Sequence, residues 1–205
     1  MSQEIEDQAI SEEQANEILK QSVAEELLTK LSDAHARAAF ENKGNVSTTA
    51  ALIAYDGSRS IAQSIAAAIL TIGGKHAPVI ICRNLVAGWE AHNDQARMQL
   101  EGMIRSGSLI PGLGNSFFKD SIDPSFQDVY DSYVKLAGPD NAIDRIVSAS
   151  NHILSELKGK EVKLYPNAAL ITAAIAHHLN MPPFYEIQIF IESRMPVWLR
   201  MIANM

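Results

Sequence analysis

Apolar residues recur at three- and four-residue spacing along most of this chain, which is the period of an amphipathic helix. In residues 11–31 a stripe of isoleucine, leucine and valine stands opposite a face rich in glutamate. Ser11 followed by Gln14 fits an N-terminal capping box. The pattern predicts an acidic amphipathic helix over 11–31 and a second, short helix over 33–41. This arm packs on its own core or on a second chain; the pattern fits both.

The same periodicity continues downstream and predicts a mostly helical chain of about ten helices. Ser58 or Ser60 is expected to cap an alanine-rich helix, whose small residues suit a central, buried position. Val79–Ile81 also fits a strand, but Pro78 suits a first helical turn and no turn signal precedes Trp89. A kink is expected near Arg194, before Pro196. Further helices are predicted over 47–55, 61–72, 78–89, 94–104, 124–136, 138–157, 168–179 and 184–202.

Composition narrows the function classes. The 205 residues are 47% hydrophobic and 20% charged, and the net charge of −7 argues against a nucleic-acid binder. Cys82 is the single cysteine, so no CxxC metal site or internal disulfide exists. The chain starts with a polar, acidic segment, and no apolar run is long enough to cross a bilayer. The simplest expectation is a cytoplasmic protein without a membrane segment or a metal.

A loop with two glycines and one proline, Ile110-Pro111-Gly112-Leu113-Gly114-Asn115, is the first candidate for binding. Glycines allow unusual backbone angles and close approach of a ligand, and Lys119 adds a cation nearby. Such a loop can hold a flat or phosphate-bearing ligand by its main chain. It also fits an ordinary connection between two helices.

His76 and Arg194 are the candidate polar side chains. His76 follows a Gly-Gly break at a predicted helix start, where it can act as acid, base or hydrogen-bond donor, or have a structural role. Arg194 stands among apolar residues, and a buried arginine needs an anionic partner. That partner is either a bound carboxylate or an internal salt bridge. His177 and His178 are neighbours on a helix and point apart, so they make a poor metal pair.

The order of these motifs resembles the citrate synthase superfamily, which includes citryl-CoA lyases and the C-terminal module of ATP citrate lyase. The order is Gly-Gly-x-His, then PGLGN with a lysine and Asp-Pro after it, then LYPN, then F-x-x-x-R. The resemblance runs from about Val46 to Ile202. It implies an all-α, citrate-synthase-like fold with the small domain and flanking large-domain helices, and a truncated N-terminal part. We expect an acidic helical arm at 1–45 and the family domain at 46–205.

The resemblance assigns roles to matching positions. His76 falls on the enolising histidine and Arg194 on an arginine that binds the oxaloacetate carboxylate. Ile110 to Gly114 resembles the loop whose main chain meets coenzyme A, and Lys119 falls where a basic residue often follows. The resemblance therefore implies coenzyme A or an acyl-CoA as substrate. Family members pair through large-domain helices, so we expect a homodimer or higher oligomer, with the arm 11–31 contributing.

Several catalytic positions of the family are substituted. Asn115 stands in place of the second catalytic histidine, Ser125 in place of a carboxylate-binding arginine, and Ala169 in place of the aspartate base. An earlier substrate-binding histidine is missing near Phe40 and Glu41. Alanine cannot accept a proton, and loss of a positioned base costs about a hundredfold to ten-thousandfold in rate.

Three functions fit this pattern. The first is a citrate-synthase-like protein without citrate synthase activity, which keeps at most coenzyme A or small-carboxylate binding. The second is a divergent enzyme of the citryl-CoA lyase or synthase type. It would make or cleave a C–C bond in a CoA thioester with His76, Arg194 and Asn115. The third is one subunit of a hetero-oligomer whose other chain supplies the missing groups.

Overall fold

The computed structural model describes residues 12–41, 44–72 and 79–205, with the side chains of the first helix described from Ile18 onward. Within these ranges the chain is all-α, as predicted, with no strand and one isolated bridge between Leu113 and Pro166. None of the described helices is long and apolar enough to cross a membrane. The helices are α1 (Glu12–Glu41), α2 (Val46–Ser58), α3 (Ile61–Leu70), α4 (Val79–Glu90), α5 (Asp94–Arg105), α6 (Pro124–Ala137), α7 (Ala142–Lys158), α8 (Ala168–His178) and α9 (Tyr185–Ala203).

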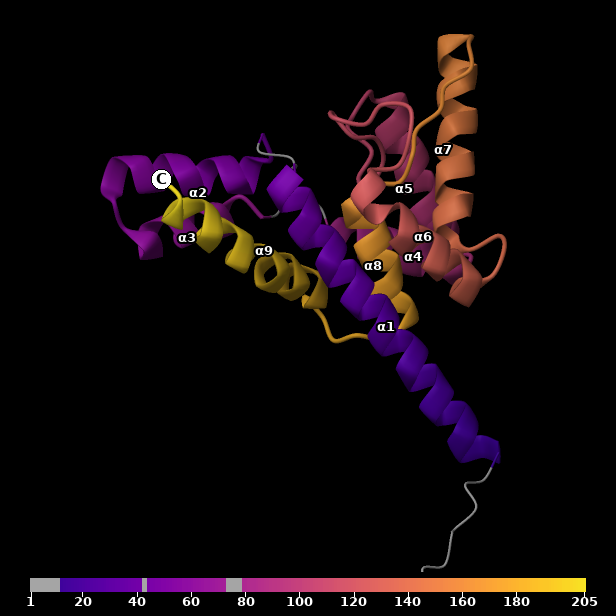
Figure 1. Ribbon diagram of the computed structural model, residues 1–205. Helices are drawn as coiled ribbons and strands as arrows, with labels where there is room; N and C mark the ends of the chain where they lie inside the picture. Colours follow the sequence, from indigo (N-terminus) through magenta and orange to yellow (C-terminus); the bar gives the residue numbers. More distant parts are fainter. Residues whose placement is uncertain (1–11, 42–43, 73–78) are drawn as a thin grey trace, which may run out of the picture.

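Helix α1 is continuous over thirty residues, so the prediction of two separate helices was wrong. Its buried stripe, Leu27, Leu31, Ala34 and Ala38, keeps helical spacing through the expected break and packs into the main core. Figure 1 shows the N-terminal half of α1 extending well beyond the other helices. The predicted Ser11 cap lies outside the described residues.

The main body consists of α4 to α8, with α8 at its centre (Figure 1). Residues 169–176 of α8 are all buried, so this helix is covered on every side. A helix that is apolar all round belongs in a core, which its alanines and isoleucines allow by packing closely against α4 and α6. Because α8 is fixed in this way, its N-terminus is held at a defined place on the cavity described below.

Helices α2 and α3 pack together and against the C-terminal part of α9, and we call these three the α2–α3 lobe. Its small core holds Ala51, Ala68 and Trp198. The prediction that α3 is central and buried was wrong, since only one face of α3 packs on α2 and α9. Leu70 is 86% exposed, and Ile61 is also exposed.

Several helices begin at a residue whose side chain caps them, and Ser60 is one of the two residues expected to cap α3. Ser60, Asn93 and Asp123 cap α3, α5 and α6 with their side chains. The segment from Val79 is helical and not a strand, as expected. The expected start of α7 at Gly138 to Asp140 was wrong. Gly138 caps the end of α6, and Asn141 caps α7, because its side chain accepts from the backbone N–H of Asp144.

Candidate functional site

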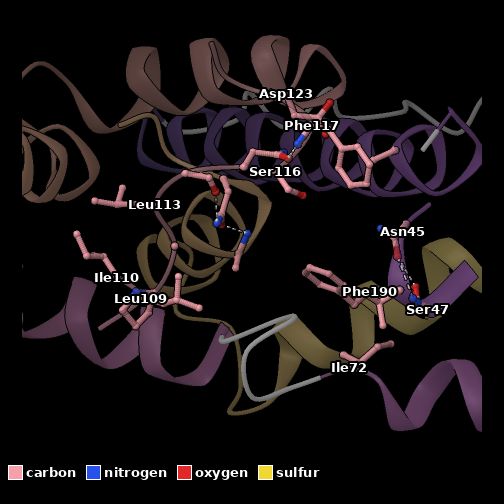
Figure 2. A pocket seen from close by; sticks show the side chains of 18 of the residues that line it. Asn45, Ser47, Ile72, Leu109, Ile110, Leu113, Ser116, Phe117, Asp123 and Phe190 are labelled. Carbon is pink, nitrogen blue, oxygen red and sulfur yellow. Dashed lines mark hydrogen bonds between the residues drawn. The ribbon is translucent and has the colours of Figure 1, made fainter. Parts of the chain in front are cut away.

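A cavity of about 980 Å³ lies between the main body and the α2–α3 lobe (Figure 2). Its walls come from the glycine loop at 108–117, from the first residues of α2, and from the ends of α3, α6 and α8. Helix α9 adds Phe190 and Arg194. The cavity is of a size that proteins use for small molecules and cofactors.

The glycine loop is fixed by the segment 164–167 through main-chain hydrogen bonds. Gly114 donates its N–H to the carbonyl of Tyr165 at 2.9 Å, and Asn167 donates its N–H to Gly112 at 2.9 Å. The side chain of Asn167 also donates to the carbonyl of Gly114 at 3.1 Å. Asn151 holds Leu164 from the other side through two hydrogen bonds. The loop is therefore shaped by the protein itself before any ligand binds.

Gly112 and Gly114 both have a positive φ, but their surroundings differ. A Cβ added to Gly112 would lie 2.7 Å from Cβ of Leu170 and 3.0 Å from Sγ of Cys82. At Gly114 the nearest atom would be 3.8 Å away, in the side chain of Leu164. The close approach at Gly112 is thus made by the protein's own core, whereas Gly114 is free of close neighbours.

Three helix N-termini converge on the cavity, because the capping residues of α2, α6 and α8 all line it. These residues are Asn45, Asp123 and Asn167. A helix N-terminus carries a partial positive charge and favours anions. Asp123 already supplies one anionic group, since its carboxylate caps α6 by accepting from the N–H of Ser125 at 2.9 Å.

Arg194 lines the cavity with only 6% of its surface exposed. It donates to Oγ of Ser47 at a long 3.4 Å, and its guanidinium carbon lies 4.6 Å from the ring centroid of Phe190. Its Nε is buried without a partner, and no carboxylate in the described part of the chain forms an ion pair with it. Burial lowers the pKa of Arg194 to about 10, while the charge of Asp123 acts in the opposite direction. The expected internal salt bridge is therefore absent from the described residues, and the bound carboxylate stays a prediction.

Asn115 lines the cavity next to the glycine loop. Its side-chain oxygen accepts from the N–H of Phe117 at 2.8 Å. The oxygen is thus occupied by the local turn, and the amide NH₂ is the group left for a ligand. An amide at this place can donate hydrogen bonds, but it cannot exchange a proton at neutral pH.

The structure brings together most of the predicted site residues. Ile110 to Gly114, Asn115 and Arg194 all line the one cavity. Lys119 is exposed and is not among the lining residues, and His76 lies outside the described residues.

The positions at which the family resemblance implies a substitution are distributed unevenly around the cavity. Ala169 lines it in the first turn of α8, whereas Ser125 is buried outside it with its hydroxyl unpartnered. Phe40 and Glu41 are exposed at the end of α1.

Sequence reasoning gave no site role to several lining residues, among them Ala38, Ser47 and Asp123. Phe190 is the aromatic residue of the F-x-x-x-R motif, one helical turn before Arg194, but only the arginine was given a role. The caps of α2 and α6 were visible as local signals only. Their convergence depends on the tertiary fold.

No group of three or more metal-ligating side chains occurs in the parts of the chain described here. His177 instead lies 2.9 Å from a carboxylate oxygen of Glu90, far along α8 from its cavity end.

The family model described as "Citrate synthase, C-terminal domain" matches residues 3–204. Among solved structures, citryl-CoA lyase from Hydrogenobacter thermophilus is similar with a TM-score of 0.63 and 19% identity. That match covers 87% of this chain and 69% of the lyase. Citrate synthase from Pyrobaculum aerophilum has a TM-score of 0.57 and 21% identity, over 87% of this chain and 45% of that one. No curated protein sequence matches the chain.

At these identities the two structures show a shared fold alone, and they confirm the expected citrate-synthase-like architecture. The family match is of a different kind, because it extends over nearly all of the sequence. The cavity is also lined by the glycine loop and the arginine that carry the family resemblance in the sequence. The chain belongs to the citrate synthase family, whose C-terminal domain it matches from residue 3 to residue 204.

Proposed function

We propose that this chain is a citrate-synthase-like protein that lacks citrate synthase activity and binds coenzyme A or a small carboxylate in its cavity. The observation that carries the proposal is Ala169. It lines the cavity in the first turn of α8, where the family has its aspartate base. Removal of a proton from an acetyl group needs a carboxylate there, and a methyl group cannot replace it.

Binding is supported by the parts of the cavity that remain. The glycine loop is fixed by main-chain hydrogen bonds to 165–167, so it is preorganised for a flat ligand. Arg194 is a buried cation with one long hydrogen bond to protein, so a carboxylate would supply the missing partner.

The experiment is a thermal-shift and calorimetric titration with coenzyme A, acetyl-CoA, oxaloacetate and citrate. Binding to the folded state raises the unfolding temperature in proportion to the logarithm of ligand concentration. We expect a shift with at least one of the four ligands, and no thiol release from acetyl-CoA with oxaloacetate. No shift with any of the four would contradict binding of coenzyme A and of these two carboxylates; other small carboxylates are tested below.

A divergent lyase or synthase is the second candidate, and Asp123 favours it. This buried carboxylate lines the same cavity as Asn115 and Arg194, so an acidic group is present, although not at the family position. The test is cleavage of citryl-CoA by the wild-type chain compared with Asp123→Asn, which keeps an N-capping side chain on α6. Cleavage that is lost in Asp123→Asn would favour the enzyme.

The third candidate, a subunit of a hetero-oligomer, predicts that cleavage appears only after a second chain is added. Co-purification with the tagged chain from its native cells, followed by the same citryl-CoA assay, tests it.

Assembly with a second copy is part of the proposal. Large apolar side chains are exposed on the projecting part of α1 and on the α2–α3 lobe, among them Leu19 and Leu70. Contiguous exposed apolar surface marks interaction sites. We therefore propose a homodimer or higher oligomer that covers these faces.

A further inference from the structure

The described residues of the cavity wall carry almost no charge. Among its described lining residues, Arg194 is the single cation and Asp123 the single anion. Ser125, where the family has a further arginine, lies outside the lining. A ligand with two or three carboxylates would find one cation for its first carboxylate and Asp123 to repel the others. A carboxylate that enters a buried site without a partner loses hydration and gains nothing in return.

Much of the rest of the described wall is apolar, although Asn45, Thr71, Asn115 and Asn167 also line it. Ile72, Ile81, Met103, Leu109 and Ile110 line it, together with Phe190 beside the arginine. Figure 2 shows Ser47, Phe190 and Ile72 on one side of the cavity and Leu109 and Ile110 on the other. A ligand held at Arg194 and Ser47 would thus have aliphatic side chains to extend over.

Two independent features place the anionic end of the ligand at Arg194. The first is the guanidinium itself, which is buried, lines the cavity and has an unpartnered Nε. The second is the first turn of α2, whose N-terminal end faces the cavity at Asn45 and Ser47. The hydroxyl of Ser47 donates to Asn45 at 2.8 Å, so its lone pairs point outward to accept from the arginine.

From these observations we infer that the cavity selects a carboxylic acid with one carboxylate and an aliphatic chain, and discriminates against di- and tricarboxylates. The carboxylate pairs with Arg194, and the chain lies against Phe190 and the aliphatic wall. This inference rests on the proposed binding of a small carboxylate and names its chemical class.

The experiment is calorimetric titration of the full chain at pH 7.5 with acetate, butyrate, hexanoate and octanoate, below micelle-forming concentrations. Adipate is the matched diacid with the same number of carbons as hexanoate, and hexanamide is the neutral control. Citrate, oxaloacetate and coenzyme A complete the series. We expect affinity to rise about fourfold for each added methylene that is buried. We also expect adipate, citrate and hexanamide to bind at least tenfold more weakly than hexanoate.

Two pairs of variants test recognition of the carboxylate and recognition of the aliphatic chain separately. Arg194→Gln should abolish hexanoate binding, whereas Arg200→Gln on the exposed face of the same helix should leave it unchanged. Ile81→Ser should weaken octanoate severalfold and leave acetate unaffected. Ile80→Ser is its control, because Ile80 is 44% exposed, against 43% for Ile81, and does not line the cavity.

Each remaining outcome overturns the inference in a recognisable way. Citrate or oxaloacetate binding more tightly than hexanoate would overturn it and leave the proposed function standing. Binding of coenzyme A without any of the acids would do the same. Hexanoate binding that persists in Arg194→Gln would show nonspecific adsorption. A chain that binds none of these compounds would refute both this inference and the binding half of the proposed function.

Discussion

Nε2 of His35 lies 2.8 Å from the hydroxyl oxygen of Thr172, and this hydrogen bond links α1 to the first turns of α8. The hydroxyl gives its own hydrogen to the carbonyl of Ala168 at 2.7 Å, so the histidine must be the donor. Nδ1 then carries a lone pair and is buried without a partner. The rings of Phe126 and Phe190 enclose the imidazole at 4.8 and 4.1 Å. The pair therefore requires a neutral histidine.

The first prediction follows from that neutral state. Burial, and secondly the charge of Arg194, lower the pKa of His35 well below its ordinary value near 6.5. Below pH 6.5 the unfolded chain binds a proton that the folded chain does not, so the free energy of unfolding falls as pH falls. The slope approaches about 1.4 kcal/mol per pH unit from this one group. Urea unfolding of wild type and His35→Leu between pH 7.5 and 5 should show a shallower decline in the variant. His152→Gln, at an exposed histidine, should keep the wild-type slope.

The second prediction compares the buried Arg194 with the half-buried Arg83. Arg194 has no ion-pair partner among the described residues. The free-energy cost of removing its charge from water therefore exceeds the stabilisation from its contacts. In the absence of ligand we expect Arg194→Met to change the free energy of unfolding by less than about 1 kcal/mol, or to raise it. Arg83 differs, because it pairs with the carboxylate of Glu186, which is 1% exposed.

Arg83→Met should therefore destabilise by about 3–5 kcal/mol, since it leaves a buried carboxylate without its partner. Urea unfolding of both variants at pH 7.5 makes the comparison. Equal losses would show that Arg194 is a structural residue, and they would weaken the case for a ligand at this arginine.

How far sequence predicted this fold can be judged from α3 and α4. The helical assignment from Val79 was correct in spite of three β-branched residues, because the local turn chemistry outweighed β propensity. The burial of α3 was misjudged. Small residues permit close packing on any face of a helix, but they do not indicate how many other helices pack against it. Likewise the break expected in α1 depended on the local residues at 32–33, whereas the apolar stripe continued through them.

The residues of the site were also predicted only in part. The glycine loop and Arg194 were found from sequence, because unusual residue types signal unusual positions. Asp123 was recognisable only as the cap of one helix, and Ser47 only as the first residue of another. That both face Arg194 across one cavity is a property of how α2, α6 and α9 pack, which no local pattern contains.

The third prediction compares the two glycines of the loop. Gly112 has φ +82° and Gly114 has φ +76°, so alanine at either position costs about 1–2 kcal/mol of backbone strain. Gly112→Ala adds a clash with Cβ of Leu170, worth a further 1–3 kcal/mol or so of overpacking. We expect thermal unfolding to show a clearly larger loss for Gly112→Ala than for Gly114→Ala. Equal losses would mean that α8 shifts to admit the methyl group.

The fourth prediction concerns assembly. Light scattering of the full chain at high micromolar concentration should give at least the mass of a dimer. Leu19 on the projecting part of α1 is 63% exposed, and Leu70 at the end of α3 is more exposed still. A charge at either position is tolerated by a monomer but not by an apolar interface, so Leu19→Glu and Leu70→Glu should lower the measured mass. Asp56→Lys, at an exposed polar position of α2, is the control. A monomeric wild-type chain would contradict the prediction.

The last prediction is about chemistry. We expect no useful condensation of acetyl-CoA with oxaloacetate by this chain, because the family resemblance puts Ala169 at the base position and Asn115 at the second histidine position. Both line the cavity, so the double variant Ala169→Asp, Asn115→His restores both groups where a substrate can reach them. Ala169 is also in the first turn of α8, where an added carboxylate is favoured by the helix N-terminus.

Groups that act as a unit are not additive, so either single variant should recover little and the double variant should recover more than their sum. Ser125→Arg is not expected to help further, because Ser125 is buried outside the cavity and an arginine there would have to displace its neighbours. Thiol release from acetyl-CoA, measured for wild type and these variants, is the readout. Robust release by the wild-type chain that is abolished in His76→Ala would show a working synthase in which other residues replace the missing base. A double variant as inactive as wild type would instead show that the cavity has lost more than its acid–base pair.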